Sequence, residues 1–137
     1  MKKCLSLIVV LILLPLMTAC TAAKVIAEEA VLTVGGKEYT SSQLEALGSM
    51  STKYTNKDGE TTTYTGVQLI AILEDAGLSG DTLVFTAADG YQADVALDEV
   101  FACSDCVVSL DNGRLRLIMP EMSSKLQVRD LVEISAQ

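Results

Sequence analysis

Apolar residues in the middle of the chain follow the period of a helix. Residues 69–76 place their apolar positions on one helical face, and Gly77 then suits a left-handed helix end, with Leu78 folding back onto it. Directly before this run, Thr65-Gly66-Val67-Gln68 has the T-x-x-Q spacing of a capping box. The pattern predicts a helix capped by Thr65 and ended by Gly77.

Two strand-like stretches follow this helix. Residues 82–87 are mostly apolar, and residues 91–97 alternate between apolar and polar. Between them, Asp89-Gly90 is typical of a type I′ turn. We expect two paired strands, the second with one buried face, and we expect the rest of the chain to pack around residues 64–99.

Shorter elements flank this passage. Before it we predict two short strands joined by a glycine turn. A helix follows, capped by Ser42 in an S-x-x-E box and ended by Gly48. The next element is a hairpin around Asn56-Lys57-Asp58-Gly59. After it we predict a helical turn over 98–102, then a hairpin whose strands span 107–110 and 114–119. A closing strand or strand-helix segment is predicted within 128–134. Hairpins interleaved with short helices predict an α+β fold with an antiparallel or mixed sheet.

Composition limits the function. The 137 residues suit one domain, and half of them are apolar and 20% charged, as in globular proteins. The chain has no histidine, which removes the commonest general base and the commonest transition-metal ligand. A formal charge of −8 argues against nucleic acid as a partner, because binding phosphate backbones requires clustered basic residues.

The N-terminal residues have the pattern of an export signal. A basic start precedes an apolar run over 5–17, which is shorter than the roughly 20 residues that span a bilayer. Leu16-Met17-Thr18-Ala19-Cys20 resembles a bacterial lipobox, with Met17 where leucine is usual. We therefore predict a signal peptide over 1–19, lipidation at Cys20, a tether over 20–30 and a domain over 31–137. An ordinary signal peptide, with Cys20 incidental, is the alternative.

This N-terminal pattern predicts an exported lipoprotein, held by its lipid on the outer face of the cell membrane or on the periplasmic side. Its partners would be the membrane, through Cys20, and a small anionic ligand or an envelope protein. Losing two lysines with the signal makes the mature chain still more acidic, so anionic lipid headgroups would repel the domain.

Cys103 and Cys106 form a C-x-x-C pair. Outside the cytoplasm such a pair usually oxidises, so a disulfide is predicted. A dithiol redox site and inert thiols are the alternatives, although the neighbouring Glu99 and Asp105 disfavour the thiolate that redox chemistry needs. Without histidine, a zinc site lacks ligands.

Several motifs occur in an order and at a spacing that resemble one known family. These are Tyr64-Thr65-Gly66-Val67 before an apolar helix that ends in Ala76-Gly77, Asp89-Gly90-Tyr91 after a strand, and Arg116 four residues before Pro120. They resemble the oxidoreductase molybdopterin-binding domain, which has the sulfite-oxidase-like fold, over about residues 31–135. The resemblance implies that mixed α+β fold, with a pterin cofactor seated in a cleft formed by loops.

The resemblance also implies candidate site residues. Arg116 and Arg129, which lies nine residues after Pro120, stand where the family has cationic residues that would bind the cofactor phosphate. The other candidates for cofactor binding are Thr65, Gly66, Asp89 and Tyr91.

The chain departs from the family where its enzymes bind molybdenum. Residues 49–63 contain no cysteine, and Lys53 and Thr55, which lie there, cannot replace a soft thiolate. Leu126 and Gln127 stand in place of a basic residue and a histidine. The sequence therefore favours a non-catalytic binding module over an enzyme. An oxidoreductase component that binds molybdopterin or another pterin, and a dithiol redox lipoprotein using Cys103 and Cys106, remain alternatives.

Structural explanations compete with several of these roles. Asp89 and Gly90 suit a turn, and Tyr64 and Tyr91 suit packing. Arg114 shares a predicted strand face with Arg116 that is either solvated or anion-binding. The acidic residues Asp94, Asp98 and Glu99 form a solvated face or, less simply, a cation site.

Overall fold

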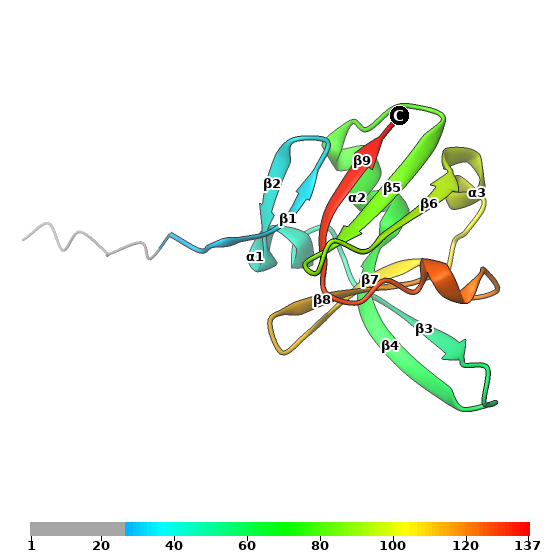
Figure 1. The fold of residues 1–137 in the computed structure, drawn as a ribbon. Helices are drawn as coiled ribbons and strands as arrows, with labels where there is room; N and C mark the ends of the chain where they lie inside the picture. Colours follow the sequence, from blue (N-terminus) through cyan, green and yellow to red (C-terminus); the bar gives the residue numbers. More distant parts are fainter. Residues whose placement is uncertain (1–26) are drawn as a thin grey trace, which may run out of the picture.

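Two β-sheets form the domain in residues 27–137, the part of the chain that the computed structural model describes (Figure 1). The first sheet has the strand order β2-β1-β9-β5-β6, and the second has the order β3-β4-β7-β8. The strands are β1 (Ala30–Val34), β2 (Lys37–Thr40), β3 (Met50–Thr55), β4 (Thr61–Gln68), β5 (Thr82–Ala87), β6 (Gln92–Ala96), β7 (Val107–Asp111), β8 (Arg114–Ile118) and β9 (Leu131–Ala136).

Both sheets are built mainly from antiparallel pairs, but β1 and β9 run parallel. The first sheet is therefore mixed. Short helices accompany the strands: α1 (Ser41–Glu45), α2 (Leu69–Ala76), α3 (Leu97–Phe101) and the 3₁₀ turn η1 (Ser124–Leu126). The predicted α+β class with a mixed sheet is confirmed.

The core lies between the sheets and α2. Among its fully buried side chains are Leu32, Ile72, Phe85, Leu117 and Ile134, which come from both sheets and from α2. The C-terminal strand β9 lies between β1 and β5, so the segment predicted as a strand or strand-helix is an interior strand. Each fully buried Leu, Ile or Phe contributes about 1.5–3 kcal/mol.

The end of α2 is as predicted, but its start is not. Gly77 has φ 65° and ψ 31°, and the Leu78 amide donates to the Leu73 carbonyl at 3.1 Å, which is the Schellman pattern. However, β4 continues through Gln68, and Thr65 does not cap the helix. Thr65 and Gly66 pair with β3 instead, and pairing between strands prevails over the local cap signal.

The first helix uses a different capping box from the predicted one. Thr40 is the N-cap, its hydroxyl accepts from the Gln43 amide, and the Gln43 side chain accepts from the Thr40 amide. The chain carries both T-x-x-Q and S-x-x-E spacing here. β2 ends at Thr40, directly after the buried Tyr39, so Thr40 and not Ser42 stands at the junction with α1.

Two hairpin turns show the same contrast. Asn112 and Gly113 both have positive φ, 50° and 76°, as a two-residue type I′ turn requires. In the β5–β6 hairpin only Gly90 does, at 89°, so the type I′ prediction for Asp89-Gly90 is wrong. Ala88 lengthens that loop to three residues, and Asp89 accepts from the Tyr91 amide at 3.0 Å. The expected alternation is confirmed for Ala93 and Val95, which are buried, whereas Tyr91 is 46% exposed and Leu97 begins α3.

The predictions for the first 20 residues lie outside the described part of the chain. They include the signal peptide over 1–19 and lipidation at Cys20. Across residues 27–137, every helix is too short or too polar to cross a bilayer.

Lys37, Tyr39 and Asp75 tie β2 to α2. The Lys37 ammonium and the Tyr39 hydroxyl each donate to one Asp75 carboxylate oxygen at 2.7 Å. The hydrogen bond from Lys37, and then that from Tyr39, holds the pKa of Asp75 below its usual range. The bond to Asp75 raises the pKa of Lys37, and burial raises the pKa of Tyr39.

This cluster predicts a pH dependence of stability. The pKa of Asp75 is lower in the folded state than in the unfolded state. The stability that Asp75 contributes is therefore fully present above its unfolded-state pKa and is lost as the pH falls through its folded-state pKa. The pKa values of Lys37 and Tyr39 are raised, so both groups deprotonate only in strongly alkaline solution. Their contribution to stability is therefore lost only there. We expect Asp75→Asn to be less stable than the wild type at neutral pH, with the gap closing below about pH 4. Urea unfolding across pH measures this gap. Glu74→Gln is the control, and a gap for Asp75→Asn that stays constant with pH would contradict the assignment.

Candidate functional site

A cleft of about 410 Å³ lies between the β3–β4 hairpin and the segment that precedes β9. We call it the arginine cleft. Its lining consists of Tyr54, Asn56, Lys57, Asp58, Glu60, Thr62, Tyr64, Arg116, Ser124, Gln127 and Arg129. The hairpin forms one wall because β4 pairs with β7 only at residues 66–68, so the rest of β3 and β4 extends beyond β7 and β8 (Figure 1).

Arg116 and Arg129 meet in this cleft. They face each other across an isolated antiparallel bridge, supported by the Leu117 amide, which donates to the Val128 carbonyl at 2.8 Å. β8 supplies the first arginine, and the chain entering β9 supplies the second. The structure thus brings together two site residues that are 13 positions apart in the sequence.

The two arginines have an unusual environment for so acidic a chain. Neither forms an ion pair with any carboxylate of residues 27–137. The Arg116 guanidinium carbon lies 5.0 Å from the centroid of the Tyr64 ring, and its Nε atom is buried without a hydrogen-bond acceptor in that same range. An unsatisfied buried donor costs about 1–3 kcal/mol. Since Nε is buried, only the terminal nitrogens of this guanidinium can meet a ligand in the cleft.

Asp89 and Tyr91 line a second, smaller hollow of about 230 Å³. It adjoins the arginine cleft because Ser124, Gln127 and Arg129 line both. The Tyr91 hydroxyl donates to the Lys125 carbonyl at 2.9 Å, which fastens the β5–β6 loop to η1. These two predicted residues therefore lie beside Arg129, although Asp89 also has the turn role described above.

Thr65 and Gly66 lie outside the arginine cleft. They line a separate, mainly apolar hollow with Leu44 and Val108. A Cβ atom at Gly66 would come within 2.6 Å of the Val108 carbonyl carbon, so glycine permits β4 to approach β7. The Thr65 hydroxyl instead bonds with the Ser51 hydroxyl at 2.9 Å. Both residues have structural roles that account for them.

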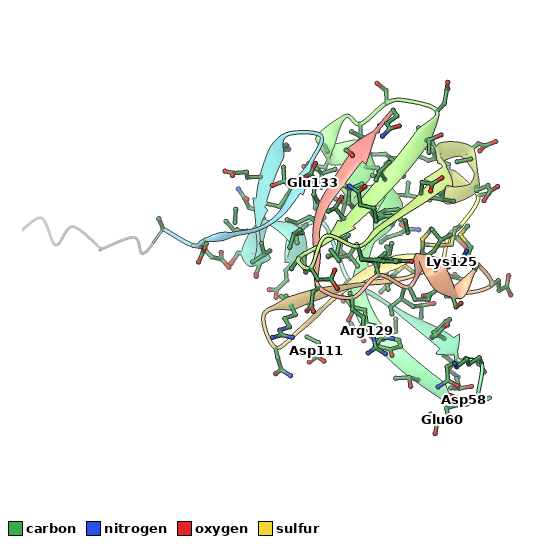
Figure 2. All side chains as sticks on the ribbon, in the orientation of Figure 1. Asp58, Glu60, Asp111, Lys125, Arg129 and Glu133 are labelled. Atoms are coloured by element: carbon green, nitrogen blue, oxygen red, sulfur yellow. A yellow bond between two sulfur atoms is a disulfide. The ribbon has the colours of Figure 1, made fainter. Side chains whose placement is uncertain are left out.

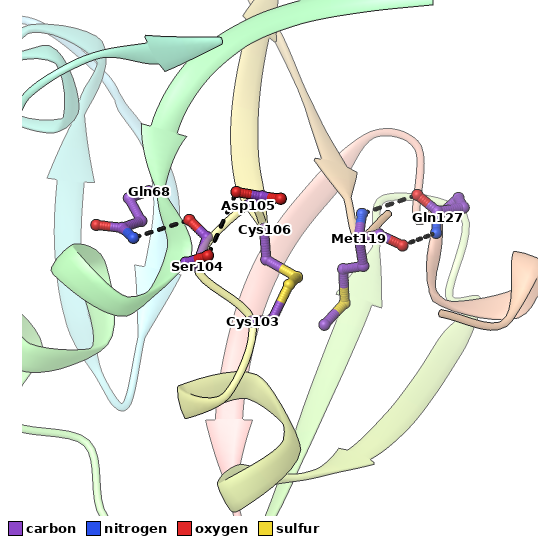
Figure 3. Close-up of a disulfide and its surroundings, with 7 residues drawn as sticks. All are labelled: Gln68, Cys103, Ser104, Asp105, Cys106, Met119 and Gln127. Carbon is purple, nitrogen blue, oxygen red and sulfur yellow. Dashed lines mark hydrogen bonds between the residues drawn. A yellow bond between two sulfur atoms is a disulfide. The ribbon is translucent and has the colours of Figure 1, made fainter. Parts of the chain in front are cut away.

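Gln127 is a residue whose role the sequence did not reveal. Its amide group donates to the Met119 carbonyl at 2.6 Å and accepts from the Met119 amide at 2.9 Å (Figure 3). The side chain thus imitates a strand partner and fixes the loop two residues before Arg129. Since its partner lies eight positions away, no local pattern marks it.

The remaining charged candidates are not brought into the cleft. Arg114 lies in another hollow, where its Nη1 is 3.6 Å from Asp130 Oδ1. The acidic residues Asp94, Asp98 and Glu99 are exposed, and no group of three potential metal ligands occurs in residues 27–137. Their exposure agrees with the predicted solvated role.

The residues present do not fit the metal of the molybdopterin cofactor that the resemblance implies. The two guanidinium groups suit a phosphate. The position of the family's metal thiolate falls on β3, where Lys53 and Thr55 alternate with the cleft-lining Tyr54 and so point to the opposite face. Ammonium and hydroxyl groups on the wrong face of the strand do not make a molybdenum site.

Cys103 and Cys106 are joined in a disulfide, as predicted, with their Cα atoms 5.6 Å apart (Figure 3). The bond links the end of α3 to the start of β7. Cys106 is fully buried, its carbonyl accepts from the Leu69 amide at 2.8 Å, and the Gln68 side chain donates to the Ser104 carbonyl at 2.9 Å. The disulfide therefore holds the turn that supports the start of α2.

Reduction of this disulfide should destabilise the domain. Closing so short a loop contributes about 2 kcal/mol in the chain-entropy relation. We expect reductant to lower the urea midpoint of the wild type correspondingly, as followed by circular dichroism. The Cys103→Ala/Cys106→Ala variant is the control, because its midpoint should not respond to reductant. Equal midpoints of the wild type with and without reductant would count against a stabilising role.

No protein-family model matches the sequence, and no curated protein matches it significantly. The resemblance to the molybdopterin-binding family therefore stays a prediction.

Proposed function

We propose that this protein is a non-catalytic binding module that holds a small anionic ligand in the arginine cleft. The observation that carries the proposal is the pair Arg116 and Arg129, which face each other without carboxylate partners in residues 27–137. Guanidinium groups match carboxylate and phosphate oxygens in a two-pronged geometry.

The rest of the cleft supports an anion as ligand. Tyr64 orients the Arg116 guanidinium by stacking, and Gln127 fixes the loop that carries Arg129. The chain bears a formal charge of −8, so two arginines left without acidic partners at one place are a local exception. An oxyanion there would supply the acceptors that the protein does not.

We place this module outside the cytoplasm, tethered to the membrane by a lipid on Cys20. The support is the sequence alone: a basic start, an apolar run too short to span a bilayer, and a cysteine after small residues. The disulfide agrees with an oxidising compartment. An envelope protein that carries the anionic group is a second form of the same proposal.

A pterin-binding oxidoreductase component on a sulfite-oxidase-like scaffold is the alternative. The arginine pair favours it, because it suits a cofactor phosphate, whereas the missing thiolate argues against molybdenum chemistry. The dithiol redox alternative is weaker, since burial of Cys106 restricts access to the disulfide.

The proposal is tested by titrating isotope-labelled full chain with inorganic phosphate and following the backbone amides by NMR. We expect saturable shifts at Arg116 and Arg129, weakening with added salt, and none at Arg114, which lies on the same strand outside the cleft. Absence of shifts at both cleft arginines, with phosphate and with acetate, would contradict the proposal. Near-stoichiometric molybdenum or a pterin chromophore in the protein from its own host would favour the alternative.

A further inference from the structure

The arginine cleft carries opposite charges at its two ends. At the base of the β3–β4 hairpin are Arg116 and Arg129; at its tip, Asp58 and Glu60 line the same cleft. Figure 2 shows Asp58 and Glu60 at the far end of the hairpin and Arg129 beside its base. Lys57 also lines the cleft, so the tip keeps one net negative charge.

The tip is held in a defined shape. Asn56 Oδ1 accepts from the backbone amides of Asp58 and Glu60, at 2.9 and 3.0 Å. Its Nδ2 donates to Glu60 Oε2 at 3.1 Å. Asp58 makes no ion pair with any cation of residues 27–137. Because the turn is already ordered before binding, the free-energy cost of ordering it does not reduce the affinity.

The strand between the ends sets the distance that a ligand must span. Tyr64, which stacks on Arg116, and Glu60 are four residues apart along an extended strand, a rise of about 13 Å. The charges of the ligand would therefore be on the order of 10 Å apart. An extended tripeptide spans about 10 Å between its ends.

We propose that the ligand is a short zwitterion of the peptide type. Its carboxylate lies on Arg116 and Arg129, and its ammonium group faces Asp58 and Glu60. This inference rests on the proposed function and adds to it the second charge and the length. A compact anion would contact only the two arginines at the base of the hairpin. An extended dianion would be repelled by the negative charge at the hairpin tip.

The test compares triglycine with N-acetyltriglycine and triglycine amide, by NMR titration of the full chain. We expect triglycine to shift the amides of Arg116 and Arg129 together with those of the tip. N-acetylation should raise the dissociation constant about fivefold, the scale of an exposed ion pair. Amidation of the C-terminus should cost more, because it removes the charge-assisted bonds to both arginines.

The matched variant is Asp58→Asn/Glu60→Gln, in which the glutamine keeps an oxygen for Asn56. It should bind triglycine and N-acetyltriglycine with equal affinity, while its affinity for inorganic phosphate is undiminished. Asp94→Asn/Glu99→Gln also removes two negative charges, from exposed residues outside the cleft, so it controls for net charge and should keep the fivefold difference.

The outcomes separate the two proposals. If the wild type binds phosphate but binds triglycine and N-acetyltriglycine equally, the zwitterion is wrong and the anion site stands. If neither phosphate nor triglycine shifts the cleft arginines, both are wrong.

Discussion

Replacing Arg116 with glutamine is expected to weaken phosphate binding about 30-fold. The reason is that the variant loses a charged donor that Tyr64 orients and that no carboxylate of residues 27–137 neutralises. Hydrogen bonds to charged groups contribute about 1.5–3 kcal/mol, and about 2 kcal/mol corresponds to this factor. Titration followed by NMR or calorimetry measures the change.

Two further variants make the result specific. Arg114→Gln removes the same charge two residues away on β8, outside the cleft, and should change the affinity by less than about twofold through general electrostatics. Arg116→Lys keeps the charge and loses the planar fork, so an intermediate loss is expected. If Arg116→Gln binds phosphate as the wild type does, Arg116 is not a ligand-binding residue.

Replacing Gly66 with alanine is expected to destabilise the domain by about 3 kcal/mol. The added Cβ would meet the Val108 carbonyl carbon at 2.6 Å and the Ser109 Cα at 2.7 Å. These are backbone atoms of β7, which pairs with β4 at this residue, so they cannot move aside as a flexible side chain would. Urea unfolding measures the loss.

Thr65→Ala is the matched control for Gly66. Thr65 is the exposed neighbour in β4, and its loss should change the free energy of unfolding by only about 0.5 kcal/mol. A Gly66→Ala variant as stable as Thr65→Ala would show that β4 and β7 can separate at little cost. It would also remove the structural explanation for this glycine and reopen its role as a site residue.

Elements set by neighbouring residues were predictable. The limits of β5 and the Schellman end at Gly77 follow from the conformational preferences of a few adjacent residues. The alternating burial of β6 follows equally from its pattern. The α+β class was therefore accessible from the sequence.

Elements that depend on distant strands were not. Thr65-Gly66-Val67-Gln68 carries a capping signal, yet these residues extend β4 because β3 and β7 offer hydrogen bonds to them. At the start of α1 two local capping boxes overlap, and the structure uses the one at Thr40. In β4 a long-range contact outweighs a local preference of about 1 kcal/mol.

The candidate site shows the same division. The sequence marked Arg116 and Arg129, and the bridge between β8 and the entry to β9 brings them together. It also marked Thr65 and Gly66, which the fold places in another hollow. No sequence pattern predicts the hydrogen bonds between Gln127 and Met119, because they join a side chain to the backbone across a loop.

The sequence by itself determined the limits of β5, the end of α2, the α+β class and the disulfide, since each rests on residues close together in the chain. Only the tertiary structure decided where β4 ends, which charged residues share a cleft, and that a hairpin extends past its sheet to place acids opposite two arginines. The physical reason is that strand pairing and burial join residues far apart in sequence, and their energies together exceed any single local preference.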